Sequence, residues 1–123
     1  MLQNTLDILK LGKNNKKIVK KLLKVVIDDI EYEISCTIDY VKDLQKEINR
    51  YKEIEKYINK KNASTKKKHI VYYEQYIDLL LRPGESIEDF NDLYQEAKAA
   101  YQLRKNILND LHKEIKNVKK LHV

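Results

Sequence analysis

Glycine and proline are almost absent from this chain: 123 residues contain two Gly, at positions 12 and 84, and one Pro, at position 83. Folds rich in β-strands need many tight turns, and those turns depend on Gly, Pro and a few other residue types. The scarcity therefore disfavours β-rich folds, collagen-like chains and Pro/Gly-rich disordered chains, and it predicts long helices. The length is that of one ordinary domain with a single core.

Turn-forming residues interrupt the sequence at three places, which are residues 12–15, 62–65 and 82–86. The first two breaks end in residues that can cap a following helix, Asn15 in one and Ser64 with Thr65 in the other. The third contains the Pro-Gly pair and is the firmest break. Beyond it, Ser86 stands three residues before Asp89, close to the spacing of a capping box. The breaks predict a short helix at 3–11 and three longer helices at about 16–60, 66–81 and 86–121.

Apolar residues recur at alternating steps of three and four in both long segments, which predicts coiled-coil-like helices. In the last segment the repeat comprises Ile87, Phe90, Tyr94, Ala97, Tyr101, Leu108, Leu111, Ile115 and Val118, with Arg104 as its polar member. In the segment 16–60 it comprises Ile27, Ile30, Ile34, Val41, Leu44, Ile48, Tyr51 and Ile58, with Thr37 as its polar member. The face expected to pack on the helix 66–81 comprises Ile70, Tyr73, Ile77 and Leu80.

Residues 30–40 also fit a second pattern, because their apolar and polar residues alternate strictly, with the period of a strand. The best strand partner would be residues 69–77, which are rich in β-forming residue types. Helix is the favoured interpretation, because no turn residue lies near and a lone strand has no clear partner.

The predicted fold is therefore an all-α antiparallel bundle that forms one domain over residues 1–123. Because its helices differ in length, a monomer would leave part of a long apolar stripe uncovered. We expect self-association, with a homodimer as the simplest form, or a helix from a protein partner to cover that stripe.

The formal net charge of +6 is divided into blocks. Residues 8–27 carry seven Lys and no acid, and residues 60–68 carry five Lys and no acid. Residues 28–58 hold nine acids against five bases, and residues 74–96 hold seven acids against one base. Only three of the 25 cationic residues are Arg, the type best suited to base and phosphate recognition, so the net charge is a weak indication of nucleic-acid binding.

Two basic segments are candidate polyanion-binding sites. In the first, pairs of Lys alternate with pairs of apolar residues, so that a helix would have one cationic face, comprising Lys16, Lys17, Lys20, Lys21 and Lys24. This pattern also fits the solvated face of a bundle helix or, less well, a helix lying on a membrane. In the second, lysines precede tyrosines whose rings could stack on bases, as single-strand binding requires. Its residues are Lys66, Lys67, Lys68, Tyr72, Tyr73 and Tyr76.

A row of acids near the start of the last helix is a candidate surface for a basic protein partner. Its residues are Glu85, Glu88, Asp89, Asp92 and Glu96. Acids at a helix N-terminus also complement the helix dipole, which is the simpler explanation for most of the row.

No catalytic or metal-ligating pattern is evident in the sequence. The histidines form no Glu-x-x-His or His-Glu-x-x-His motif, and two Gly are too few for a phosphate-binding loop. The single Cys36 lies in an apolar stretch and is expected to be a buried thiol. We therefore expect no enzyme activity, no metal and no cofactor. The longest aliphatic runs are three residues and no signal peptide precedes them, which predicts a cytoplasmic protein without a membrane partner.

These patterns favour a non-enzymatic helical protein–protein interaction module. The abundance of Lys, Asn, Ile and Tyr is what an AT-rich genome encodes, and it suggests a small viral, phage or mobile-element accessory factor that binds and modulates a host or defence complex. The alternative is a nucleic-acid-binding protein that uses residues 16–24 and 60–76.

Overall fold

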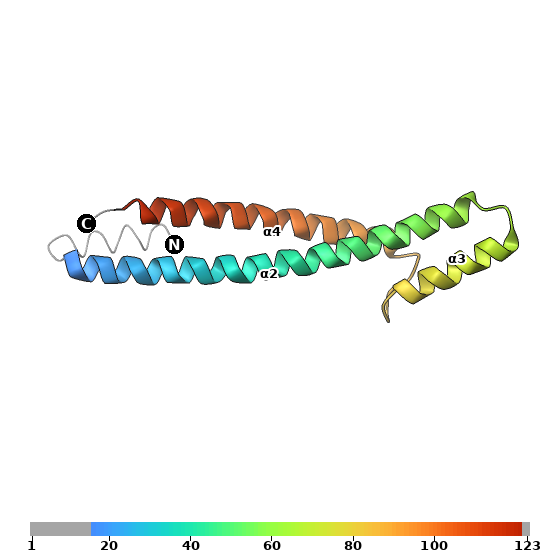
Figure 1. Cartoon of the computed structure of the whole chain (residues 1–123), viewed down its shortest axis with the longest axis horizontal. Helices are drawn as coiled ribbons and strands as arrows, with labels where there is room; N and C mark the ends of the chain where they lie inside the picture. Colours follow the sequence, from blue (N-terminus) through green and yellow to red (C-terminus); the bar gives the residue numbers. More distant parts are fainter. Residues whose placement is uncertain (1–15, 122–123) are drawn as a thin grey trace. The chain divides into compact units, whose positions relative to one another are not determined.

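The computed structural model describes residues 16–121, and every regular element in that range is an α-helix. The helices are α2 (Lys16–Ala63), α3 (Lys67–Leu80) and α4 (Phe90–Lys119), and they pack together with α2 in contact with both of the others (Figure 1). The predicted all-α bundle is confirmed. The strand alternative for residues 30–40 is wrong, because they lie inside α2. The helix predicted at 3–11 and the break at 12–15 lie outside the described residues.

The described chain divides into two compact units, to which α2 and α4 both contribute. The first, here called the hairpin unit, comprises residues 16–41 of α2 and residues 103–121 in and just beyond α4. The second, here called the three-helix unit, comprises residues 42–102. Each unit has its own buried cluster of apolar side chains.

The core of the hairpin unit is made of aliphatic residues from two antiparallel helices. Its buried members are Val19, Leu23, Ile30, Leu111 and Val118. Two polar residues predicted within the apolar repeats are accommodated locally. The Thr37 hydroxyl donates to the Glu33 carbonyl at 2.7 Å, and the Arg104 guanidinium lies 4.4 Å above the ring centroid of Tyr40, within the range of a cation–π contact.

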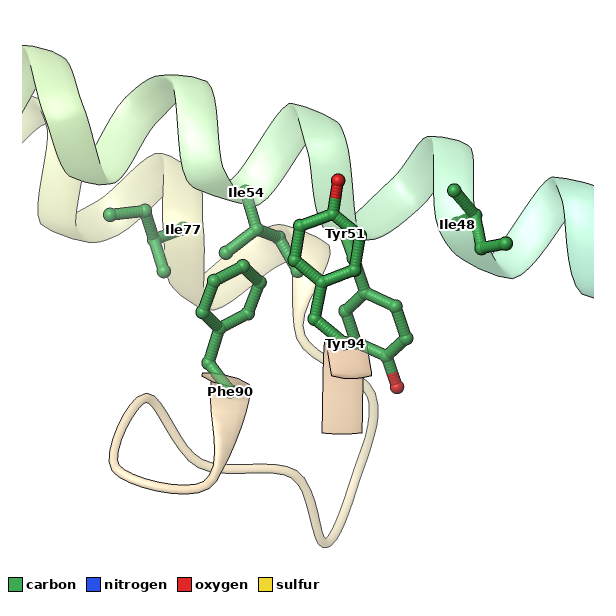
Figure 2. Close-up of a cluster of buried hydrophobic side chains, with 6 residues drawn as sticks. All are labelled: Ile48, Tyr51, Ile54, Ile77, Phe90 and Tyr94. Atoms are coloured by element: carbon green, nitrogen blue, oxygen red, sulfur yellow. The ribbon is translucent and has the colours of Figure 1, made fainter. Parts of the chain in front are cut away.

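The core of the three-helix unit combines aliphatic and aromatic side chains from all three helices (Figure 2). The buried residues are Ile48, Tyr51 and Ile54 from α2, Ile77 from α3, and Phe90 and Tyr94 from α4. The rings of Tyr51, Phe90 and Tyr94 lie 5.7 to 5.9 Å apart, centroid to centroid, at tilted or edge-on angles. Such aromatic packing adds about 0.5–1.5 kcal/mol per pair to the free energy gained by burying the rings.

The connection between α3 and α4 is built on the predicted Pro-Gly turn. The Glu85 N–H donates to the Arg82 carbonyl at 3.0 Å, and Gly84 has a φ of +85°. Pro83 at the second position and Gly84 at the third define a type II turn. The Ser86 hydroxyl then accepts from the Asp89 N–H at 3.3 Å and donates to its carboxylate at 3.0 Å. Because residues 87–89 form this capping turn, α4 begins at Phe90 and not at the predicted residue 86.

Two local predictions are wrong. Ser64 does not cap α3, whose N-cap residue is Lys66 without a side-chain bond; its hydroxyl instead donates to the Lys60 carbonyl at the end of α2, at 2.8 Å. Cys36 is exposed. At 100° per residue, position 36 turns away from the packed face that carries Ile30 and Ile34, so an apolar neighbourhood in sequence did not mean a buried position.

At Gly84 we expect a substitution to lower stability through the backbone conformation alone. A Cβ at this position would meet no atom within 4 Å, so Gly84→Ala is penalised only by its positive φ. We expect a loss of about 1–2 kcal/mol in the free energy of unfolding, measured by urea denaturation. Gly84→Asn should lose less, because Asn tolerates this region better. Equal stability of Gly84→Ala and the wild type would contradict the turn geometry.

Candidate functional site

Four tyrosine side chains from two helices gather in the three-helix unit and form what we call the tyrosine cluster. Its members are Tyr57 of α2 and Tyr72, Tyr73 and Tyr76 of α3. The rings of Tyr57 and Tyr76 are closest, with centroids 4.3 Å apart. The Tyr72 ring lies 5.5 Å from Tyr73 and 6.1 Å from Tyr76. These contacts join α2 to α3 and leave the outermost ring, Tyr72, 55 % exposed.

Lysines of α2 surround the inner part of this cluster. The ammonium groups of Lys56 and Lys60 lie 5.5 and 5.2 Å from the ring centroid of Tyr57. Partial burial and the hydrogen bond with Tyr76 raise the pKa of the Tyr57 phenol. The cluster is therefore a cationic, aromatic surface, and Lys61 beside it is paired with Glu74 at 3.2 Å.

The solvent-facing side of α3 carries large apolar residues that the described chain leaves open. Leu79 is 83 % exposed, and Tyr72, seven residues earlier, lies on the same face. Val71 is also exposed. The opposite side of α3 packs inward through Ile77, as predicted. Tyr72 and Leu79 with Val71 are here called the α3 face.

The predicted basic residues are exposed in both segments. Lys66, Lys67 and Lys68 lie at the start of α3, where no acid occupies the first turn. Of the tyrosines predicted with them, Tyr72 is exposed whereas Tyr73 and Tyr76 are half-buried in the cluster. The lysines of the first segment lie in the hairpin unit, where the residues between them, Val19 and Leu23, are buried. The exposed lysines of that segment are Lys16, Lys17, Lys20, Lys21 and Lys24.

The predicted acidic row divides into two groups. Glu88, Asp89, Asp92 and Glu96 are exposed, and Asp89 is held by the Ser86 hydroxyl. Glu85 differs from them, because its side chain is only 14 % exposed and both of its carboxylate oxygens accept hydrogen bonds within the chain. We therefore assign Glu85 to the internal framework of the three-helix unit.

Glu85 forms a bidentate pair with Arg50 of α2. The two guanidinium nitrogens donate to the two carboxylate oxygens at 2.6 and 2.9 Å. The Tyr51 hydroxyl and the Arg82 backbone N–H also donate to Glu85, at 2.8 and 2.7 Å. Arg50 further donates to the Leu80 carbonyl at 3.0 Å, and so joins α2 to the end of α3 and to the following turn.

A second carboxylate completes this network. Glu47, one turn before Arg50 on α2, accepts from Arg50 at 3.0 Å and is also paired with the Arg82 side chain. The donors around Glu85, Arg50 first among them, lower the pKa of its carboxyl to about 2. Burial and the neighbouring Glu85 raise the pKa of the Tyr51 phenol.

Three residues that the structure makes important were not predicted from the sequence: Arg50, Tyr57 and Leu79. Two signals pointed to Arg50 and Leu79. Arg is rare in a chain with 22 Lys, and an Arg where Lys is the rule points to a use of the bidentate geometry that Lys lacks. Leu79 lies outside the apolar repeat of its own helix, which marks an apolar side chain that the helix cannot bury against its neighbour.

Among residues 16–121, no three His, Cys, Asp or Glu side chains lie close enough together to hold a metal ion. In the same range, no helix combines the length and the apolar character needed to cross a membrane. An open pocket of about 310 Å³ in the three-helix unit is lined by Lys61, Glu74, Ile77, Asp78 and Ile87.

Comparisons with protein-family models, with curated proteins and with solved structures gave no match to this chain. The described residues define it as an all-α protein of three packed helices.

The Arg50–Glu85 pair predicts a specific loss of stability in acid. Because the pKa of Glu85 falls from 4.5 unfolded to about 2 folded, its ionised form stabilises the fold above pH 4.5, and this stabilisation is lost as the pH falls toward 2. The pKa difference corresponds to about 3 kcal/mol. We expect Glu85→Gln to be destabilised by that order at pH 7 and to approach the wild type near pH 2, in urea denaturation followed by circular dichroism.

The control for this experiment is Glu88→Gln, which removes an exposed carboxylate a few residues away. It should follow the wild-type pH profile throughout. If the free energies of unfolding of Glu85→Gln and the wild type differ by the same amount at pH 2 and at pH 7, the role of the ionised carboxylate is contradicted.

Proposed function

We propose that this chain is a non-enzymatic helical module that binds a protein partner through the α3 face. The observation that carries the proposal is the exposure of Leu79 and Tyr72 one heptad apart on a helix whose other side is packed. Paired apolar anchors at this spacing are what a groove or a helix of another protein recognises.

The energetics of the α3 face suit an interface. Burying a side chain such as Leu79 contributes about 1.5–3 kcal/mol, and tyrosines are enriched among the residues that dominate binding free energy. Because the tyrosine cluster and Ile77 hold α3 against α2, a partner would meet an ordered surface and little conformational entropy would be lost on binding.

Exposed acids at and just before the start of α4 support a choice of partner. Asp92 and Glu96 are four residues apart and lie on one side of α4, and Glu88 lies in the turn that precedes it. An acidic row of this kind accelerates and orients the approach of a basic protein. The partner we propose therefore offers an apolar groove together with basic residues.

The proposal also includes the kind of genetic element that encodes this chain. The AT-rich composition of the sequence supports an accessory factor of a virus, phage or mobile element, which would act by binding a host or defence complex and changing its activity.

Matched surface variants test this proposal. We expect cross-linking in a lysate of the source organism to recover a protein whose capture falls about tenfold or more with Leu79→Ser, because one buried leucine of an interface is lost. The control Leu103→Ser changes an exposed leucine of the hairpin unit, away from the α3 face, and should capture the partner as the wild type does. Capture that is unchanged by Leu79→Ser contradicts the α3 face, and loss only with Glu88→Gln and Asp92→Asn together moves the contact to the acidic row.

A second candidate function, single-stranded nucleic-acid binding, is favoured by one observation: lysines and an exposed tyrosine lie together at the tyrosine cluster. Lys66, Lys67 and Lys68 would neutralise phosphates while a base stacks on the Tyr72 ring.

Fluorescence anisotropy with labelled single-stranded oligonucleotides at two salt concentrations tests the second function. If it is correct, replacing Lys66, Lys67 and Lys68 with Ala should reduce the slope of log affinity against log salt by about two. Tyr72→Ala should weaken binding by about 1–3 kcal/mol. Replacing Lys16, Lys17 and Lys20 with Ala tests the other basic segment in the same assay. No binding by the wild type at low salt contradicts this function.

A further inference from the structure

The outer face of α2 in the hairpin unit carries a second apolar stripe, distinct from the one that packs on α4. Val25 is 55 % exposed and Tyr32, seven residues later, is 73 % exposed. The half-buried Leu22 and the exposed Cys36 continue the stripe at the same three- and four-residue steps. Cys36 lies four residues after Tyr32 on α2, which places the two side chains on one face. Asp29 is the charged position within it.

Charge is segregated along the edge of this stripe. The residues of this edge repeat at the same three- and four-residue steps as the stripe, shifted by one position toward the N-terminus. They are Lys17, Lys21, Lys24, Asp28 and Glu31. The first three are basic, the last two are acidic, and the sign changes next to Val25. All five are exposed, and Glu31 is also 3.6 Å from Lys119 of its own chain.

We propose that the stripe is the interface of a homodimer in which two copies of α2 pack antiparallel, with the two-fold axis close to Val25. In that arrangement the basic half of each edge faces the acidic half of the other, and Val25 meets its own symmetry mate. An isologous interface requires this kind of self-complementarity. Parallel pairing in register would instead place lysines against lysines and acids against acids. Like charges facing one another along the edges of a coiled coil disfavour that pairing.

The make-up of the hairpin unit supports a second copy as the occupant. Its described part consists of two helices, and Val25 and Tyr32 stay exposed on the side of α2 that faces away from its buried cluster. Two such hairpins packed through α2 would form a four-helix arrangement that covers Val25 and Tyr32 of both copies. This inference concerns residues of the hairpin unit alone, so it does not depend on the proposed function of the α3 face.

Cysteine cross-linking tests both the occupant and the orientation. With Cys36→Ser as the background, Val25→Cys should form a disulfide-linked dimer under mild oxidation, because the two sulfurs would meet at the two-fold axis. The wild type should not, because eleven residues of helix on each side place the two Cys36 about 33 Å apart. Efficient cross-linking of wild-type Cys36 would overturn the antiparallel arrangement. Absence of cross-linking at both positions would overturn the dimer at this stripe.

Sedimentation equilibrium of the full chain measures the dimer dissociation constant and so tests the dimer independently. We expect Val25→Glu to raise the dimer dissociation constant by about tenfold or more, since it removes apolar contact and places two like charges at the axis. Leu79→Glu, an equally drastic change on the α3 face, should leave the constant unchanged. A wild-type chain that stays monomeric up to about 100 µM, where even weak interfaces associate, would overturn the proposal.

A charge exchange completes the test. Lys21→Glu and Asp28→Lys should each weaken the dimer by about threefold to tenfold, and mixing the two variants should restore wild-type affinity, because each edge is then complementary again. Restoration distinguishes pairing between copies from a stripe covered by another part of the same chain. Mixed variants that remain as weak as each alone would contradict the edge contacts.

Discussion

The bidentate pair between Arg50 and Glu85 is the interaction on which the three-helix unit depends. It joins the middle of the longest helix to a turn 35 residues later, and the same guanidinium also binds the last carbonyl of α3. A pair so little exposed stabilises only if its remaining donors and acceptors are satisfied, and Tyr51, Glu47 and the Arg82 N–H supply most of those partners. Once this network is made, α3 must return along α2 and α4 must start beside it, which brings the tyrosine cluster together and leaves Leu79 facing outward.

Arginine has a consistent structural use in a chain whose cations are almost all lysine. Arg50 forms a bidentate pair with a carboxylate, Arg104 lies over the Tyr40 ring, and Arg82 pairs with Glu47. The uses of Arg50 and Arg104 exploit the planar guanidinium, which the ammonium of lysine cannot replace. The lysines, by contrast, are mostly exposed and form the charged surfaces. The few arginines therefore report on how the chain is held together, and the arrangement of the lysines bears on what it binds.

Much of the fold could be predicted from the sequence, whereas the candidate site could be predicted only in part. Helical periodicity and the lack of Gly and Pro placed α2 and α3 within a few residues of their observed ends, and the Ser86–Asp89 spacing predicted the cap of α4. The missed features depend on contacts between residues far apart in the chain. Cys36 was expected to be buried because its neighbours are apolar, but burial depends on which side of a helix meets another helix. Tyr57 was missed because only packing against α3 brings it to the other tyrosines.

The sequence by itself determined the helical character of residues 16–121 and the segregation of charge, because both follow from the order of neighbouring residues. The type II turn is equally local, since Pro restricts φ and Gly accepts a positive φ wherever they occur together. Tertiary structure alone decided which apolar positions are covered. Phe90 and Tyr94 are buried against Tyr51, whereas Leu79, Val25 and Tyr32, no less apolar in sequence, remain open. A helix buries only the sides that meet neighbouring helices, so the side that stays exposed is known only once the packing is known.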